Sequence, residues 1–454
     1  MLVLKESPQI NIYLAMLPPE LVKLNDELTR VSTLLDNEEF LAPFIARFKT
    51  TTGRPTVPVQ TYLRIMYLKH RHQLSYEVVA EQVRDSIMWR IFCGIPFDQP
   101  IPHYTTLIKL TKKYGHEIME TLNQALVNEA REKKLIVGRK LRCDTTVVES
   151  DIHYPTDASL LSDCVRVINR TVKKIKEQGV AVNAEFHNRS RSIKKQIFSI
   201  AKVLKRRTNE TRQDVRKITS SILSTTQEVV DRAEQVAAEA KRCIFDQAGD
   251  ATGKVMKTIQ SLESTIEIAK RIVAQTTTVI QGNTHIKNRI VSIFDLEARP
   301  IVKGKLKAPT EFGTKLFVQD CEKKIITGYQ VYEGNPNDDT LLVPAVDAHI
   351  AMFGRAPIDR GFASPKNEAA LRTKGVEKIS LPRRGWINYE RRDFQSQFWF
   401  KYLQRWRAGG EALISHLKRK YGIGRSLSRG INGTKTWVGL GILAYNLRQI
   451  ARLT

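Results

Sequence analysis

The sequence predicts an α/β protein, in which a mixed β-sheet is flanked by helices. Three observations lead to this prediction. Residues 1–137 carry apolar residues at helical spacing, short β-branched stretches begin near residue 138, and a polar, glycine-poor segment at about 157–288 returns to helical spacing. We therefore predict an N-terminal helical domain (1–137) and a second domain (138–454), with a large helical insertion at about 157–288 after its first strand.

The N-terminal domain is expected to contain three helices joined by short turns. Apolar residues recur at helical spacing over 57–73, and Ser75 is a typical N-cap for a segment that ends at Gly94. A third helix should span about 105–131. Three such helices with many lysines and arginines are compatible with a helix-turn-helix-like DNA reader and equally with a packing or dimerisation module.

Short strands of one sheet are expected after residue 135. The stretches with β-branched or alternating character are 135–150, 291–294, 314–319, 324–334 and 355–359. Because successive side chains point to opposite faces of a strand, Leu141 and Cys143 should face one side of the first strand, and Arg142 and Asp144 the other. A charged residue in the middle of a strand is unusual and marks Asp144 as a candidate functional residue.

The rest of the chain is predicted to be largely helical. The insertion should hold a pair or more of long antiparallel helices. A helix and a strand are expected soon after Asp359, and segment 399–422 has helical periodicity, although Gly409-Gly410 interrupt it. Residues 436–452 are predicted to form an amphipathic helix that packs on the core.

The chain is strongly basic, with 73 lysines and arginines against 47 aspartates and glutamates, which gives a net charge of +26. A hydrophobic content of 42% argues against wholesale disorder, so the excess charge should lie on folded surfaces. Nucleic acid is the commonest partner of such surfaces. Between Arg360 and Arg452, twenty lysines and arginines stand against five acidic residues, and here we expect Arg383, Arg384, Arg391 and Arg392 to contact DNA.

Several classes of protein are disfavoured by the sequence. It has no apolar run of about 18 or more residues, so we expect a soluble, cytoplasmic protein without a membrane partner. The five cysteines occur singly, which predicts reduced thiols and no structural zinc. Residues 433–436 are similar to the end of a P-loop but lack its upstream glycine, so no nucleotide cofactor is expected.

Three acidic residues stand at positions suited to metal-dependent chemistry on phosphodiesters. Asp144 lies within the first strand, Asp359 closes a later strand, and Glu411 lies on a helix between Arg407 and Lys418. Cutting a phosphodiester requires an activated nucleophile and a stabilised leaving oxygen, which two Mg²⁺ ions supply together, and Mg²⁺ prefers carboxylate oxygens. Taken singly, each residue is more typical of a surface salt bridge, a turn or a cap.

The motifs around the two aspartates resemble those of DDE transposases from bacterial insertion sequences. The first aspartate opens DTTVVESD (144–151), which is followed by HYPTDASLLSD (153–163). The second lies in IDRGFASPKNE (358–368), and the segment 53–86 resembles the N-terminal helical domain of the same enzymes. The resemblance covers nearly the whole chain, is weakest over 175–285, and looks closest to the ISNCY group.

The glutamate lies in a further motif of this family. Arg407, Glu411 and Lys418 match the R-E-K part of the Y-R-E-K signature of one large branch. The position of the tyrosine is occupied by Gln404, with Tyr402 nearby, so the resemblance implies no role for that tyrosine here.

The resemblance implies an RNase H-like core and a transposase that cleaves DNA strands and joins them at the ends of a mobile element. It assigns Asp144, Asp359 and Glu411 as catalytic ligands of Mg²⁺, for which Mn²⁺ can substitute, and it places Arg407 and Lys418 on DNA phosphates. The implied partners are double-stranded DNA, both element ends and target, and further copies of the chain on that DNA. The implied location is the bacterial cytoplasm, in association with the nucleoid.

Two other functions stay open at this point. An RNase H-like nuclease or resolvase would use the same carboxylates without joining strands, and a catalytically retired relative would only bind DNA. Among neighbouring residues, His153 and Asp157 could line the site, although a loop role fits them better. Glu149, five residues beyond Asp144, should point to the opposite side of the strand. Trp399 and Trp406 could stack on bases but have the spacing of core residues.

Overall fold

The chain folds into two compact units, one formed by Met1–Asp151 and Ile301–Thr454 and the other by Ile152–Pro300. The computed structural model describes residues 1–5, 16–48, 52–206, 210–245, 252–302, 310–360, 364–382 and 386–454. Within these ranges, no helix combines the length and the apolar character that crossing a membrane requires.

The first unit begins with helices that pack on one another. They are α2 (Pro19–Val22), α3 (Asp26–Leu35), α4 (Ala42–Arg47), α5 (Val59–Arg71), α6 (Tyr76–Asp85), α7 (Ile87–Phe92) and α8 (Tyr104–Glu132). The helix predicted over 57–73 is confirmed as α5. The single helix predicted over 75–94 is wrong, because Ser86 leaves the helical conformation and its Oγ accepts a hydrogen bond from Trp89 N at 3.3 Å, which begins a new helix.

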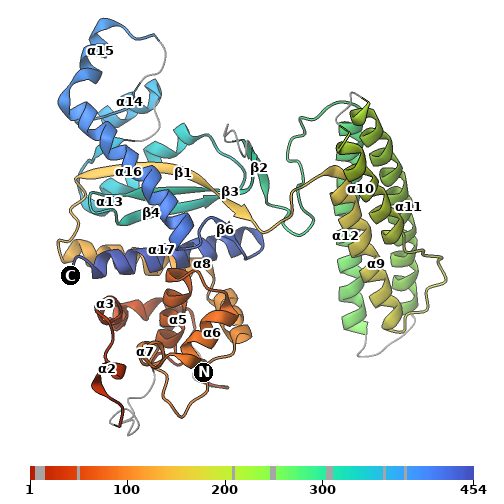
Figure 1. The fold of residues 1–454 in the computed structure, drawn as a ribbon, viewed down its shortest axis with the longest axis horizontal. Coiled ribbons are helices and arrows are strands. Elements are labelled where there is room, and N and C mark those ends of the chain that lie inside the picture. The colour runs from red at the N-terminus through yellow and green to blue at the C-terminus, as the bar shows by residue number, and fades with distance from the viewer. Residues whose placement is uncertain are drawn as a thin grey trace. The chain divides into compact units, whose positions relative to one another are not determined.

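A mixed sheet lies at the centre of this unit (Figure 1). Its strands are β1 (Lys140–Ser150), β2 (Arg299–Val302), β3 (Thr310–Asp320), β4 (Ile326–Tyr332), β5 (Ile358–Arg360) and β6 (Arg425–Ser426). β3 pairs antiparallel with both β1 and β4, whereas β5 and β6 pair parallel with β1. The strand predicted at 291–294 is wrong: this segment is irregular, and Ile293 packs against the helical core of the second unit.

The two faces of β1 are covered by different helices, as the alternation of its side chains predicts. Leu141 and Cys143 belong to a core formed with α13 (Leu342–Phe353) and α14 (Pro365–Thr373). Val148, on the other face, belongs to the core that contains α8, α16 (Phe398–Lys420) and α17 (Gly430–Ala451). In Figure 1, α16 crosses the sheet on this side.

Two predictions for the C-terminal region need correction. The helix α16 continues through Gly409-Gly410 without a break. The predicted amphipathic helix at 436–452 begins earlier, as α17, and is buried on most sides, because α3, α5, α8 and β4 all contact it. The short helix α15 (Tyr389–Ser396) precedes α16.

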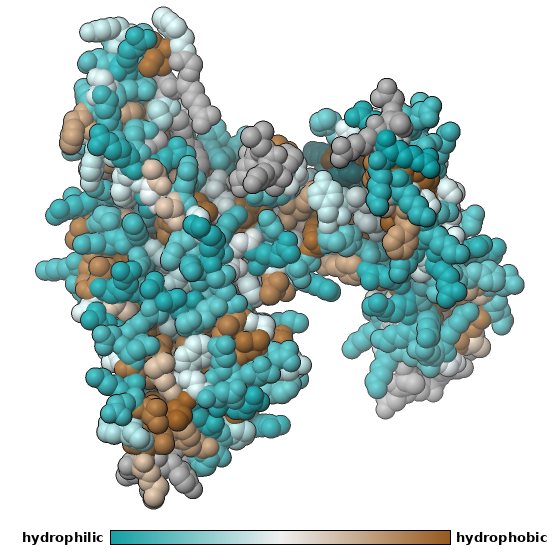
Figure 2. Space-filling view, viewed as in Figure 1, coloured by the Kyte–Doolittle hydropathy of each residue, from teal (hydrophilic) through white to brown (hydrophobic). Residues whose placement is uncertain are grey.

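The described residues of the second unit form a bundle of four helices, where the sequence predicts a pair or more of long antiparallel helices (Figure 1). They are α9 (Asp157–Glu177), α10 (Ser190–Leu204), α11 (Thr211–Phe245) and α12 (Thr252–Ile280). Thr156 and Ser159 form a capping box at the start of α9. Isoleucine, leucine, valine and alanine side chains from these helices form a separate core, and the faces visible in Figure 2 are mainly hydrophilic.

Candidate active site

Asp144 lies in the middle of β1, on the face that α16 covers. Its Cα pairs with Val318 of β3, its side chain is half-buried, and its Oδ1 accepts a hydrogen bond from Thr145 N at 2.9 Å. On the other side of β1, Asp359 lies on β5, with its Cα paired to that of Leu141. The backbone of Asp359 is therefore on the adjacent strand, three residues before Asp144; its side chain lies outside the described residues.

The helix that carries Glu411 runs along the same face of β1. Tyr402 accepts a hydrogen bond from Lys140 Nζ at 2.8 Å, and Trp406 O accepts one from Arg142 Nη1 at 2.6 Å. Further along, Leu413 shares a core with Val148. Gly409 and Gly410 approach the Arg142 side chain, so the turn that carries Glu411 lies beside Arg142, two residues before Asp144 on β1. The Glu411 side chain is exposed.

A buried ion pair fixes α16 above β1. Arg142 is 1% exposed and binds Asp320 through two hydrogen bonds, Nε to Oδ1 at 2.8 Å and Nη2 to Oδ2 at 2.5 Å. Its guanidinium also lies 4.7 Å from the centre of the Trp406 ring. Burial raises the pKa of Asp320 to about 6 against the lowering effect of Arg142, and the nearby Asp144 carboxylate raises it further.

Gly409 and Gly410 are the residues of α16 that make room for Arg142. A Cβ at Gly409 would lie 2.9 Å from Arg142 Nη1, and one at Gly410 would lie 3.0 Å from Arg142 Cδ. Both distances are shorter than ordinary van der Waals contact. The glycine pair, which costs helix propensity, is therefore explained by the close approach of the arginine side chain.

The chemistry of Asp144, Asp359 and Glu411 fits a magnesium site, because carboxylate oxygens are the hard ligands that Mg²⁺ takes. Among the side chains that the structure describes, which exclude that of Asp359, there is no group of three or more His, Cys, Asp or Glu able to hold a metal. Asp144 lies on the face of β1 that α16 covers, Glu411 is exposed on that helix, and the backbone of Asp359 lies on the next strand.

The cations predicted to bind DNA lie in different environments. Arg407 is half-buried one turn before Glu411, and Lys418 lines a pocket two turns after it. Arg391 is bound by neighbouring residues of the first unit. Its Nη1 lies 2.7 Å from Glu368 Oε1, and its Nη2 donates a hydrogen bond to Leu381 O at 2.7 Å. Arg392 is exposed on α15. The predicted Arg383 and Arg384 lie outside the described residues.

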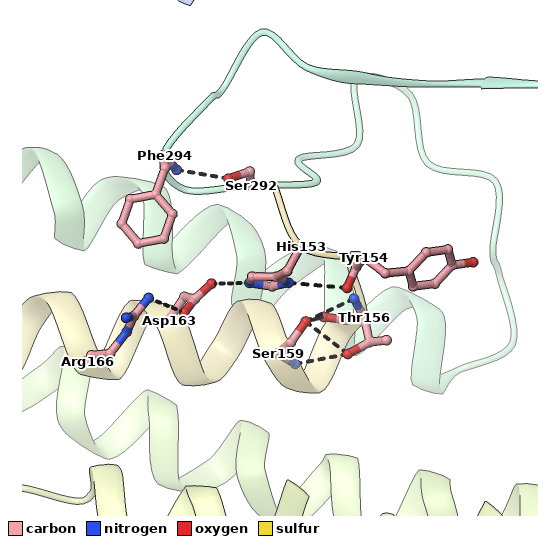
Figure 3. Close-up of polar contacts among 8 residues, drawn as sticks. All are labelled: His153, Tyr154, Thr156, Ser159, Asp163, Arg166, Ser292 and Phe294. Carbon is pink, nitrogen blue, oxygen red and sulfur yellow. Dashed lines mark hydrogen bonds and ion pairs between the residues drawn. The ribbon is translucent and has the colours of Figure 1, made fainter. Parts of the chain in front are cut away.

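The segment after β1 is tied to α9 by a small polar network (Figure 3). His153 Nε2 lies 2.7 Å from Asp163 Oδ2, and Arg166 Nη2 lies 2.7 Å from Asp163 Oδ1. The hydrogen bond to Asp163 raises the pKa of His153. Asp157 forms an ion pair with Arg289 at 2.8 Å. Both residues therefore have structural partners; His153 lies in the irregular segment before α9, as expected, whereas Asp157 is the first residue of that helix and not part of a loop.

The other residues considered near the site make structural contacts. Glu149 forms an ion pair with Arg425 of β6 at 3.2 Å. Gln404 donates to Ser380 O at 2.9 Å, which ties α16 to the segment before it. Trp406 covers the Arg142 guanidinium, and Trp399 packs edge-on against Phe394 and Phe400.

The roles of Arg142 and Asp320 were not predicted from the sequence. The alternation along the first strand places Arg142 on the side of Asp144 but indicates no partner for it, because Asp320 is 178 residues away. The only local signal was Gly409-Gly410 inside a helical pattern. Two glycines at such a site indicate that a bulky group approaches the helix closely.

Comparison with known proteins identifies two family regions. Residues 19–113 match the family described as "Transposase domain (DUF772)", and residues 299–447 match the family described as "Transposase DDE domain". The second region contains Asp359 and Glu411. The first carboxylate, Asp144, lies between the two regions.

One curated relative is similar over part of its length. It is an uncharacterized protein from Rhizobium meliloti, named ORF8 in nfe locus, and is 32% identical over 133 residues. The match spans 28% of this chain and 64% of the length of that relative. No solved structure matches the chain.

Proposed function

The chain belongs to the DDE-type transposases of insertion sequences, and on this premise we propose that it cleaves DNA at the ends of a mobile element and joins those ends to target DNA. The observation that carries the proposal is the placement of Glu411 on the helix that crosses β1 on the face of Asp144. The matched transposase region supports the same assignment.

Asp144, Asp359 and Glu411 are the proposed metal ligands. When bound, Mg²⁺, or Mn²⁺ in its place, supplies the activation of a water or a DNA 3′-hydroxyl and the stabilisation of the leaving oxygen. The role of the protein is to hold the carboxylates in place, which it does through a strand and a helix rather than through loops. Arg142, held by Asp320, fixes the distance between β1 and α16 and thereby positions Glu411 relative to Asp144.

We propose an RNase H-like arrangement for the sheet. The support is its topology: β1 is flanked on one side by the antiparallel pair β3 and β4, and on the other by the parallel β5. This order brings the aspartates of β1 and β5 to neighbouring strands. Residues 1–137 would then form a DNA-binding or dimerisation domain, and 138–454 the catalytic domain with its helical insertion at about 157–288.

The proposed substrate is double-stranded DNA of the element ends and of the target. Arg407 and Lys418 flank Glu411 on α16 and would contact phosphates near the cleaved bond, where charge-assisted hydrogen bonds position the strand. Arg383, Arg384 and Arg392 are proposed to extend this surface, whereas the Arg391 guanidinium is engaged by Glu368. We propose that several copies assemble on DNA at the bacterial nucleoid, without a nucleotide cofactor.

The test is metal-dependent nicking and joining of DNA that carries the element ends. The variants Asp144→Ala, Asp359→Ala and Glu411→Ala should each lose at least about 10³-fold of the activity in Mg²⁺, and combining them should add little, since the three act as one unit. DNA binding measured in Ca²⁺ should persist. Glu149→Ala is the control, because its carboxylate pairs with Arg425.

The outcome distinguishes the proposal from its two rivals. Nicking without a joined product would indicate a nuclease or resolvase, and binding without either reaction would indicate a retired transposase. If the Asp359→Ala variant cleaves at the wild-type rate, the proposed site is wrong.

A further inference from the structure

A pocket of about 540 Å³ lies in the first unit, where α5, the start of α6, the end of α16 and β6 meet. Its basic lining residues are Lys69, His70, Lys418 and Arg425, and the acidic Glu149 also lines it. The volume and the partly apolar lining are those of an ordinary ligand pocket, and the basic side chains outnumber the acidic one. Lys418 connects the pocket to the proposed active site, because it follows Glu411 by seven residues, or about 10 Å along a helix.

Lys69 is the unusual residue of this pocket. It is only 2% exposed, and its Nζ lies 4.1 Å from the centre of the Trp437 ring and 4.6 Å from that of Tyr76. Within the part of the chain that the structure describes, no carboxylate pairs with it. Burial alone lowers the pKa of Lys69 to about 7. A buried ammonium without a counter-charge is costly, so an anion that enters the pocket would be strongly favoured.

Apart from His70, the neighbours of Lys69 favour the same kind of ligand. His70 is buried and supplies no donor to the pocket, because its Nδ1–H faces Tyr421 O at 3.4 Å. Arg425 is shared between Glu149 at 3.2 Å and Asp151 at 3.9 Å, so it still has guanidinium hydrogens to donate. Ser75 and Leu74, also in the lining, mark the N-terminus of the ten-residue helix α6, whose dipole favours negative charge.

We propose that this pocket binds a phosphate group of the DNA strand that passes the catalytic carboxylates, with Lys69 from the N-terminal helices and Lys418 from α16 as its two ammonium donors. The inference rests on the proposed function, because it takes DNA as the substrate. DNA is favoured over a small phosphate compound because Lys418 lies on the same helix as Glu411, so a strand held at the carboxylates continues toward the pocket.

The proposal gives the N-terminal helices a second role. Gln73 Nε2 donates a hydrogen bond to Arg419 O, and His70 Nδ1 lies 3.4 Å from Tyr421 O, so α5 is attached to the end of α16. The helices that carry the first transposase region therefore line the substrate path beside the carboxylates. They need not act only as a separate reader of the element ends.

The experiment measures binding of the full chain to duplex DNA in Ca²⁺, which separates binding from cleavage. Lys69→Met should weaken binding about 5- to 10-fold and reduce the slope of log affinity against log salt by about 0.9, the value for one phosphate contact. Lys113→Met is the matched control: Lys113 is exposed, lies 5.1 Å from the Phe48 ring centre and is absent from the pocket, so its loss removes the same charge. The control should change the slope by less.

A double-mutant cycle tests whether the two lysines share one phosphate. The loss of affinity in Lys69→Met combined with Lys418→Met should be smaller than the product of the two single losses. Lys69→Met removes a buried charge and should melt at or above the wild-type temperature. Should it fail to fold, Arg425→Gln, which changes an exposed residue of β6, provides the second variant, with a several-fold loss of binding expected.

A comparison with inorganic phosphate tests whether the pocket binds a phosphate of DNA or a small anion. Sodium phosphate should raise the melting temperature of the wild-type chain more than sodium chloride of equal ionic strength, and Lys69→Met should abolish this difference. Unchanged DNA binding in Lys69→Met, with phosphate stabilisation only in the wild type, would overturn the assignment to DNA in favour of a small anion. Unchanged behaviour in both assays would overturn the site. A wild-type chain that binds DNA in this way but never cleaves it would refute the proposed activity alone.

Discussion

Replacing Gly410 with alanine tests whether Arg142 fixes the position of α16 above β1. Two effects of opposite sign compete at this residue. Alanine is favoured over glycine in a helix by about 1 kcal/mol. The new Cβ, however, would lie 3.0 Å from Arg142 Cδ and 3.2 Å from its Nε.

The crowding should be the larger effect, because the arginine cannot move aside freely. Its guanidinium is bound to Asp320 through two hydrogen bonds and to Trp406 O through a third. Overpacking in a well-packed core costs about 1–3 kcal/mol. We therefore expect Gly410→Ala to destabilise the first unit by up to about 2 kcal/mol after the gain in helix propensity is included.

The effect of Gly410→Ala on stability should change from destabilising to stabilising when Arg142 is absent. Replacing a buried ion pair by apolar residues of similar size is often neutral or stabilising, so the background Arg142→Met with Asp320→Leu should fold. In that background, Gly410→Ala should stabilise the unit by about 1 kcal/mol. Removing Asp320 alone is a different perturbation, because it leaves a buried charge without its partner and should cost about 3–5 kcal/mol.

The assay is urea unfolding followed by tryptophan fluorescence. All five tryptophans lie in the first unit, so the signal reports on that unit and not on the helical bundle. Strand cleavage provides a second readout, since a shift of Glu411 by about 1 Å can reduce the rate about 10²-fold. If Gly410→Ala stabilises the wild-type chain and cleavage is unchanged, Arg142 does not set the position of α16.

Two further predictions concern titratable groups. Burial raises the pKa of Glu27, but hydrogen bonds from Arg71, Arg448 and Tyr67 lower it to about 2, below its usual 4.5. The ionised Glu27 therefore stabilises the fold above pH 4.5, and this stabilisation is lost as the pH falls toward 2. Glu27→Gln should therefore cost about 2 kcal/mol at pH 7, allowing for solvent screening, and nothing near pH 2, as measured by urea unfolding at both values. In the second unit, Asp163→Asn should lower the pKa of His153, because the hydrogen bond to Asp163 is the main cause that raises it. An NMR titration of the ring that shows no change would exclude that contact in solution.

Much of the fold could be predicted from local patterns. The helices α5, α8 and α16 and the strands β1, β3 and β4 follow from apolar periodicity over segments long enough to be distinctive. The errors have local causes. At 75–94 a single serine cap divides a continuous apolar pattern, and at 291–294 an apolar run was interpreted as a strand although its side chains complete a helical core.

The site could be predicted only in part, because its parts meet through contacts between distant residues. The alternation along β1 predicts Arg142 and Asp144 on one face, and the contacts of Arg142 show that its own side chain faces α16. The pairing of Arg142 with Asp320 depends on tertiary structure and has Gly409-Gly410 as its only local signal, whereas the pocket around Lys69 has none. Lys69 in particular lies in an apolar helical pattern, where a lysine is ordinarily interpreted as a solvent-exposed residue.

The glycine pair of α16 shows that residues of low helix propensity inside a helix can indicate a close tertiary contact. A helix designed only for stability would have alanine at both positions, and the glycines cost about 1 kcal/mol each. This loss is explained by the neighbour they admit, since Arg142 approaches the helix backbone one residue before Glu411. A side chain bound at three points by Asp320 and Trp406 leaves α16 little freedom to slide along β1. In the proposed metal site, that restriction would keep the carboxylates of Asp144 and Glu411 at a fixed separation, so the glycines that lower helix propensity mark the place where the site would be held together.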